Sequence, residues 1–227
     1  MINIVIPSFG RPERIHDVVV NASDNTGNPC FIWVVVEPEQ VDDYVMRLPF
    51  NKPVGLVANS RSRNYAGAVN TVANLMAPDP AYLFLGADDL NFNKFWDIPA
   101  LQTMGALPNI KVVGTNDLYN PYVLKGYHAT HYLIDFSYIQ DPGGVVDGEK
   151  GLVLHEGYDH NFTDTEFIAT AKQRAVFAPC LGSVVEHNHF TAGKSRLDAT
   201  YEKGTLNLER NRTLYYQRQS LWMGISR

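Results

Sequence analysis

The chain has 227 residues and a formal net charge of −5, with 45% hydrophobic and 19% charged residues. This composition fits an ordinary globular protein of one large domain or two small ones. No apolar run approaches the roughly 18 residues of a membrane helix, which excludes a membrane span.

The cysteines and the start of the sequence indicate a reducing compartment. Cys30 and Cys180 have no spacing typical of a metal site or a disulfide framework, so we expect two small core residues. The sequence begins directly with an apolar run and shows no basic leader, so we expect a cytoplasmic protein.

Strand-like apolar runs alternate with helical patterns in the first half of the chain. We expect strands at 2–6, 31–36, 54–58, 82–85 and 110–114, and helices at 13–22, 66–73 and 95–106, the second ending at Pro78. This alternation predicts an α/β fold with a mostly parallel sheet flanked by helices.

The second half has fewer helices. We expect strands at 128–135, 151–155, 175–181 and 184–190, a loop at 141–151, one helix at 162–171, and mixed helix and loop from 192 onward. We interpret the chain as one domain with a ligand-binding half (1–117), a second half that completes the site (118–192) and a C-terminal tail (193–227).

The tail is basic, whereas the rest of the chain is acidic. Residues 193–227 hold seven Lys or Arg and three Asp or Glu. Arg210, Arg212 and Arg218 alternate with Tyr215, Tyr216 and Trp222, a pattern that suits DNA but also a sugar or an oligomer interface. A solvated helix of mixed charge is the other interpretation.

Polar residues follow each strand of the first half. They are Ser8 and Arg11, Glu37, the segment from Asn59 to Asn64 with Arg61 and Arg63, and the pair Asp88 and Asp89. Ligands of open α/β sheets bind beyond the carboxyl ends of the strands, so these loops should converge on one site. The arginines suit phosphate and Glu37 suits a ribose or a base, although each is also typical of an exposed turn.

Asp88 and Asp89 follow the apolar run Tyr82–Leu85 and the breaker Gly86. Two adjacent carboxylates at a strand end suit Mg²⁺ or Mn²⁺ bound together with substrate phosphates, although Asp is also a common turn former. His187 and His189 lie two apart on an expected strand and so face the same side, as metal ligands or as surface histidines.

A helix start occurs at Thr163-Asp164-Thr165-Glu166. The pattern predicts a capping box with Thr163 as the N-cap and Glu166 reaching back to the backbone. Asp164 is then free to act as a general base on an acceptor hydroxyl.

These pieces together resemble the nucleotide-sugar glycosyltransferases of the GT-A fold, in particular the family-2-like inverting enzymes. The matching segments are Ile4–Pro12, Val34–Glu37, Arg61–Asn64, Phe84–Asp89, Asn161–Phe167 and Glu186–His189.

The resemblance implies an inverting transferase with a UDP-, GDP- or TDP-sugar donor and a metal-assisted reaction. Asp164 would be the catalytic base. The donor would be bound by Pro7, Ser8, Arg11, Glu37, Asn59, Arg61, Arg63 and Asp88, and Mn²⁺ or Mg²⁺ by Asp88, Asp89, His187 and His189. Gly86 replaces the first acid of the family's Asp-x-Asp motif, so either fewer ligands would hold the metal or the reaction would proceed without one.

The size and the absent leader look like phage-encoded glycosyltransferases, which modify virion proteins, sugars or hydroxymethylated DNA bases. Two alternatives stay open. A nucleotidyltransferase is disfavoured because the loop after the first strand has one Gly and no Lys. A non-catalytic nucleotide- or carbohydrate-binding module would keep a degenerate site.

Overall fold

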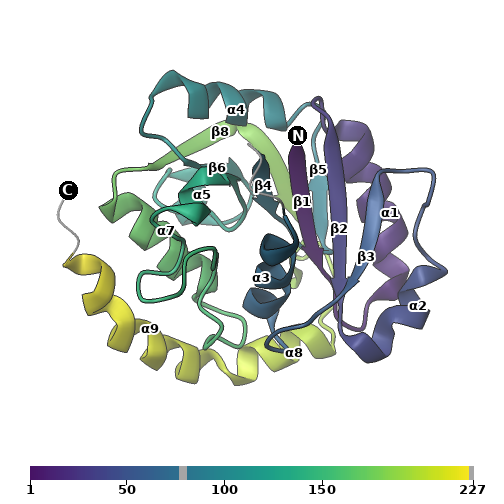
Figure 1. The fold of residues 1–227 in the computed structure, drawn as a ribbon. Coiled ribbons are helices and arrows are strands. Elements are labelled where there is room, and N and C mark those ends of the chain that lie inside the picture. Colours follow the sequence, from purple (N-terminus) through teal and green to yellow (C-terminus); the bar gives the residue numbers. More distant parts are fainter. Residues whose placement is uncertain (77–80, 225–227) are drawn as a thin grey trace.

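A computed structural model describes residues 1–76 and 81–224. Its centre is an eight-stranded sheet with the order β3-β2-β1-β4-β7-β6-β8-β5, and helices cover both faces (Figure 1). The strands are β1 (Ile2–Pro7), β2 (Cys30–Val36), β3 (Val54–Ala58), β4 (Tyr82–Leu85), β5 (Leu90–Phe92), β6 (Val112–Asn116), β7 (Tyr132–Asp135) and β8 (Phe177–His187). The predicted α/β sheet is confirmed.

The helices vary from single turns to sixteen residues. They are α1 (Pro12–Asn25), α2 (Val41–Val45), α3 (Tyr65–Leu75), α4 (Asp97–Ala106), α5 (Pro121–Leu124), α6 (Ser137–Gln140), α7 (Thr163–Gln173), α8 (Ala199–Leu206) and α9 (Leu208–Met223), with 3₁₀ turns at Pro38–Gln40 and Phe190–Ala192. The expected helix end at Pro78 lies outside the described residues. No described helix is long and apolar enough to span a membrane.

The first four strands in the order β3-β2-β1-β4 are parallel, which brings their carboxyl ends to one edge of the sheet. Every residue of β1 is buried, since helices pack on both of its faces. One core cluster packs α1 through Ile15 and Val19, and the other packs α3 through Val69 and Val72. The polar loops predicted to converge therefore start from a rigid, buried framework.

The second half of the sheet contains reversed strands. β7 is antiparallel to both β4 and β6, while β8 is parallel to β6 and antiparallel to β5 at its far end. The two strands expected at 175–181 and 184–190 form the single strand β8, whose pairing with β6 shifts register between Thr115 and Asn116. The strand expected at 151–155 is wrong: this segment is loop, and Asn70 of α3 bonds its backbone at Val153 and Leu154.

The C-terminal tail folds onto the body of the protein. Figure 1 shows α8 and α9 (yellow) running along one side of the molecule, with α9 next to α7. Trp222 is buried and packs against Tyr215, which in turn packs against Phe162 at the start of α7. These aromatic residues therefore attach the tail, while Tyr216 remains exposed.

Candidate functional site

Asp88 lies in the turn between β4 and β5 and joins two loops. Ser8 donates to its Oδ2 at 2.6 Å, and Arg11 donates from Nη1 to its Oδ1 at 2.9 Å. Burial and the neighbouring charge of Asp89 raise the pKa of Asp88 to about 6 even though Arg11 opposes the shift. The loops after β1 and β4 therefore meet as the sequence predicted.

Asp89 is held by partners from far along the chain. Its Oδ2 lies 3.2 Å from Nε2 of His187 and accepts from the Tyr201 hydroxyl at 2.6 Å. Burial would raise the pKa of Asp89, but the hydrogen bond and charge of His187 lower it well below its usual range. Its Oδ1 is buried without a partner among the described residues.

Gly86 occupies the place where the related motif has an acid. A Cβ there would lie 3.0 Å from the carbonyl oxygen of Val5 in β1. The backbone of Gly86 approaches β1 closely because its N–H donates to that same oxygen at 2.9 Å. The close packing of β4 on β1 thus explains why no side chain precedes Asp88 by two residues.

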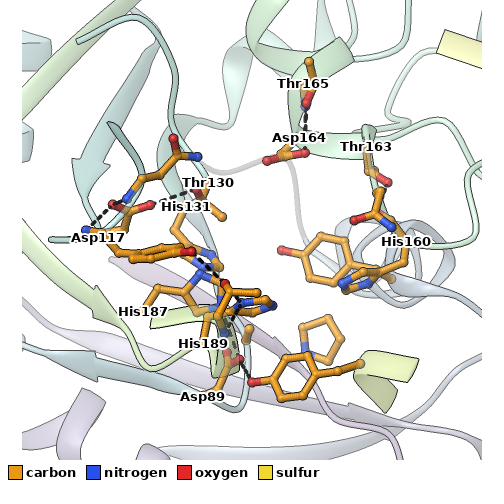
Figure 2. Close-up of a pocket in the computed structure, with 18 of the residues that line it drawn as sticks. Asp89, Asp117, Thr130, His131, His160, Thr163, Asp164, Thr165, His187 and His189 are labelled. Carbon is orange, nitrogen blue, oxygen red and sulfur yellow. Dashed lines mark hydrogen bonds and ion pairs between the residues drawn. The ribbon is translucent and has the colours of Figure 1, made fainter. Parts of the chain in front are cut away.

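A cavity of about 420 Å³ opens beside Asp88 and Asp89. Pro7, Arg11, His187 and His189 line it, together with Asp164 at the start of α7. Figure 2 shows Asp164 across this cavity from Asp89. The predicted general base and all four predicted metal ligands therefore line one cavity.

Asp164 is paired with His128, a residue that sequence reasoning missed. Nε2 of His128 lies 3.0 Å from Oδ2 of Asp164, and both side chains line the cavity. Oδ1 of Asp164 accepts from the backbone N–H of Thr165. Although burial opposes it, the hydrogen bond and charge of His128 lower the pKa of Asp164, and Asp164 raises the pKa of His128 in return.

The predicted capping box is wrong. Phe162, in a left-handed conformation with φ of 69°, is the N-cap of α7, and Thr163 is the first helical residue. The hydroxyl of Thr163 donates to the carbonyl of His160. Glu166 is buried and accepts instead from Tyr158 and Arg218. A tertiary ion pair has replaced the local cap.

A second cavity, of about 470 Å³, adjoins the first. Both are lined by Arg11 and Tyr65, and the second also by Glu37, Glu39 and Arg63. Nε of Arg63 lies 3.0 Å from Glu37, and the same guanidinium pairs with Glu39. The loops after β2 and β3 therefore contribute to a site continuous with the first cavity.

Asn59 and Arg61 do not line either cavity. Asn59 donates to Glu37 at 3.1 Å and so helps to position a carboxylate that lines the second cavity. Arg61 pairs with Glu156, whose carboxylate also accepts from Ser62 at 2.7 Å. Arg61 thus ties the loop after β3 to the loop that precedes α7.

The histidines of the site differ in what their nitrogens contact. His189 is the N-cap of a 3₁₀ turn, and its Nδ1 accepts from the Thr191 N–H. His131, which sequence reasoning missed, is 4% exposed, and its Nδ1 lies 3.1 Å from the Leu85 carbonyl. Burial lowers the pKa of both rings to about 4, so both are neutral at neutral pH.

The tail contributes to the site through α8 rather than through a basic surface. Asp198, just before α8, accepts from Nη2 of Arg11 at 2.7 Å, and Arg11 lies over the ring of Tyr201. Several tail cations form ion pairs within the chain: Lys194 with Glu186, Arg210 with Asp159, Arg212 with Glu209 and Arg218 with Glu166 and Asp147.

No protein-family model matches the sequence, and no curated protein matches it. The structure, however, resembles several solved glycosyltransferases. Glucosyl-3-phosphoglycerate synthase from Mycobacterium tuberculosis, in complex with phosphoglyceric acid, matches with a TM-score of 0.63 and 11% identity, over 95% of this chain and 79% of that one. The chain has the GT-A glycosyltransferase fold.

Two further GT-A neighbours are longer than this chain. The mannosyltransferase PcManGT from Pyrobaculum calidifontis, in complex with GDP-Man and Mn²⁺, matches with a TM-score of 0.56 and 13% identity over 79% of this chain. TarS 1-349 from S. aureus, in complex with UDP, matches with a TM-score of 0.55 and 10% identity over 78%. The chain spans only 54% and 57% of these two proteins.

Proposed function

We propose that this chain is an inverting glycosyltransferase that moves a sugar from a nucleoside-diphosphate donor to an acceptor hydroxyl. The observation that carries the proposal is the first cavity, where the carboxylate of Asp164 lies across from the cluster of Arg11, Asp88 and Asp89. A base on one side and a charged cluster for a leaving group on the other are what direct displacement requires.

We assign the two adjoining cavities to the two parts of a nucleotide sugar. We place the nucleoside in the second cavity near Glu37 and Arg63, and the sugar in the first cavity near Asp164. Arg11 lines both, so its guanidinium is placed to bind the diphosphate between them. The GDP-Man and UDP complexes of two fold neighbours support this donor class.

We propose that a divalent metal ion binds beside Asp89. Among the described residues no group of three His, Cys, Asp or Glu side chains is arranged to hold a metal ion. The buried Oδ1 of Asp89 nevertheless has no partner within the described part of the chain, and His187 lies against the same carboxylate. Mn²⁺ or Mg²⁺ bound there with substrate oxygens would neutralise charge on the diphosphate.

The chain's own residues then perform the transfer. Asp164 accepts the proton of the acceptor hydroxyl while that oxygen forms its bond to the anomeric carbon. The bond from this carbon to the diphosphate breaks, and the nucleoside diphosphate leaves with the electron pair. Arg11 stabilises the charge that develops on the leaving oxygens. Attack opposite the leaving group inverts the configuration.

The ion pairs of the tail bear on the acceptor. The sequence left three acceptor classes open, namely a hydroxymethylated DNA base, a virion protein and a saccharide. The buried Arg218 supports the fold through its ion pairs with Glu166 and Asp147, and the exposed Arg210 and Arg212 are paired with Asp159 and Glu209. These pairings favour a protein or saccharide acceptor over DNA.

The test is incubation with UDP-, GDP- and TDP-sugars and Mn²⁺, with release of the nucleoside diphosphate as the measurement. We expect slow hydrolysis of at least one donor. Asp164→Asn should lower turnover about 10²- to 10⁴-fold. Asp141→Asn is the matched control, since this carboxylate is exposed and lies outside both cavities. The proposal would be contradicted if the chain neither hydrolysed nor bound any of these donors.

A further inference from the structure

The side of the first cavity away from Asp89, which we call the acceptor side, carries negative charge. Asp117 and Asp164 lie there (Figure 2). His128 is bonded to Asp164 and can balance only one of the two charges. Arg11 is the only Lys or Arg among the described residues that line this cavity, and we have placed it at the diphosphate. A phosphate or carboxylate on the acceptor would therefore meet like charge without a cation to bind it, which disfavours an anionic acceptor.

Two asparagines that line the same cavity each use one end of the side-chain amide within the chain. Oδ1 of Asn120 accepts from the Tyr122 N–H at 2.9 Å, which fixes the orientation of the amide and leaves Nδ2 as a donor for a ligand. Nδ2 of Asn161 donates to the Gly204 carbonyl at 2.8 Å, which leaves Oδ1 as an acceptor. A hydroxyl both donates and accepts, so a ligand with several hydroxyls can pair with both amides, whereas an ionised phosphate only accepts.

An aromatic ring is held beside these groups by a strained loop. Leu118 has a left-handed φ of 58°, which is uncommon for a residue with a side chain. The buried carboxylate of Asp117 holds this loop, since it accepts from the N–H groups of Tyr119 and Asn120 at 3.0 and 2.9 Å. The Tyr119 hydroxyl donates to Thr191 at 2.7 Å, and both residues line the cavity. The loop thus presents a fixed and partly exposed aromatic face to a ligand.

We propose that the acceptor is an uncharged saccharide, bound by Tyr119, Asn120 and Asn161 with one hydroxyl at Asp164. The serine or threonine of a protein acceptor has a single hydroxyl, which Asp164 would take, and both amides would stay unpaired at a cost in affinity. A sugar ring has further hydroxyls for the two amides and an apolar face for Tyr119.

The transfer would then join two sugars. The acceptor oxygen forms a bond to the anomeric carbon of the donor, its proton passes to Asp164, and the nucleoside diphosphate leaves with the bonding electrons. This inference rests on the proposed function for the transfer step, but the binding of the saccharide can be measured without turnover.

The test is saturation-transfer NMR on the full chain, with and without UDP, GDP and TDP. The ligands are methyl glycosides and disaccharides of glucose, mannose, galactose and N-acetylglucosamine, the matched uronates and sugar 6-phosphates, and an uncharged serine peptide. We expect at least one neutral glycoside to bind, and its charged counterparts to bind at least about tenfold more weakly because of the like charge on the acceptor side.

Asn120→Asp is the sharpest variant, because an aspartate still accepts from the Tyr122 N–H but has no Nδ2 donor. It should weaken glycoside binding about two- to tenfold, the usual effect of losing a neutral hydrogen bond. Asn51→Asp, at an exposed asparagine outside both cavities, is the control. Tyr119→Ala should weaken binding by a similar factor and Tyr119→Phe, which keeps the ring, by less. Tyr216→Ala, at an exposed tyrosine of α9, is the matched control.

Four results would overturn the inference: charged sugars that bind as tightly as neutral ones, binding of the serine peptide alone, no neutral glycoside bound, or equal glycoside binding in a folded Asn120→Asp. The ligand series on the wild-type chain decides even if the variants misfold. Donor hydrolysis without any glycoside binding would refute the saccharide but keep the transferase. Asn120-dependent glycoside binding without nucleotide binding would do the reverse.

Discussion

Arg11 and Arg218 are both buried arginines paired with two carboxylates, but they differ in how completely they are paired. Arg218 on α9 donates from Nε, Nη1 and Nη2 to Glu166 and Asp147, at 2.7 to 3.1 Å. Arg11 bonds Asp88 and Asp198, yet its buried Nε has no partner among the described residues. Arg11 also lines both cavities. An arginine whose three side-chain nitrogens are all paired stabilises the fold, whereas an arginine with an unpaired nitrogen beside a cavity is available to a ligand.

The largest effect should come from Arg218→Met. It leaves Glu166 buried without its cation, and breaking such a pair costs about 3–5 kcal/mol of unfolding free energy. Urea denaturation measures the loss. Arg212→Met, which removes an exposed pair with Glu209, should change stability little. A loss below about 1 kcal/mol for Arg218→Met would break the comparison.

Arg11→Met should act on ligand binding more than on stability. Removing a charge-assisted contact worth about 1.5–3 kcal/mol should weaken nucleoside-diphosphate binding about 10- to 100-fold. The thermal midpoint should fall less than for Arg218→Met. Asp88 keeps the hydrogen bond from Ser8, and its raised pKa allows it to take up a proton, while Asp198 is partly exposed and can be hydrated. Calorimetry and thermal unfolding measure the two effects. Unchanged nucleotide affinity would place the diphosphate elsewhere.

His128→Gln tests the pair beside the proposed base. His128 lowers the pKa of Asp164, so its removal should raise that pKa and move the acid limb of kcat/KM to higher pH. Asp117 and Lys172 also influence the pKa of His128, and His131 influences that of Asp164, so the variant keeps these three residues. The pKa of His128 is raised in the folded wild-type chain, so its protonation stabilises the fold at pH values below the usual histidine pKa. This stabilisation is lost as the pH rises through the pKa of the folded state. An acid limb that stays in place would contradict the role of His128.

The smallest effect is expected for Asp198→Asn. Asp198 occupies Nη2 of Arg11, the position we assign to a phosphate oxygen. A partly exposed ion pair contributes under about 1 kcal/mol, so its weakening should raise nucleoside-diphosphate affinity only about two- to fivefold. Weaker binding in Asp198→Asn would instead make Asp198 part of the donor site.

The parallel strands and the convergence at Asp88 could be predicted because each strand is a short apolar run that ends at polar or turn-forming residues. These are local patterns, and parallel pairing then brings the loops together. Gly86 likewise appeared as a departure in the motif, but its cause, the carbonyl of Val5, required the register of β4 on β1.

The remaining site residues have no local signal. Tyr201 reaches Asp89 from 112 positions along the chain. His128 and His131 lie in a loop before β7, although the sequence predicted that the strand would begin at His128. Glu166 matched a capping pattern, yet the tertiary partner Arg218 took its carboxylate. Local propensity is overridden where a buried charge needs a partner.

The most direct test of the account is a crystal structure with a nucleoside diphosphate and Mn²⁺. The account predicts the base near Glu37 and Arg63, the diphosphate against Arg11 in place of Asp198, and the ion against Asp89, with Asp164 facing the open first cavity. A nucleotide bound outside the two cavities, or a diphosphate that does not contact Arg11, would contradict it.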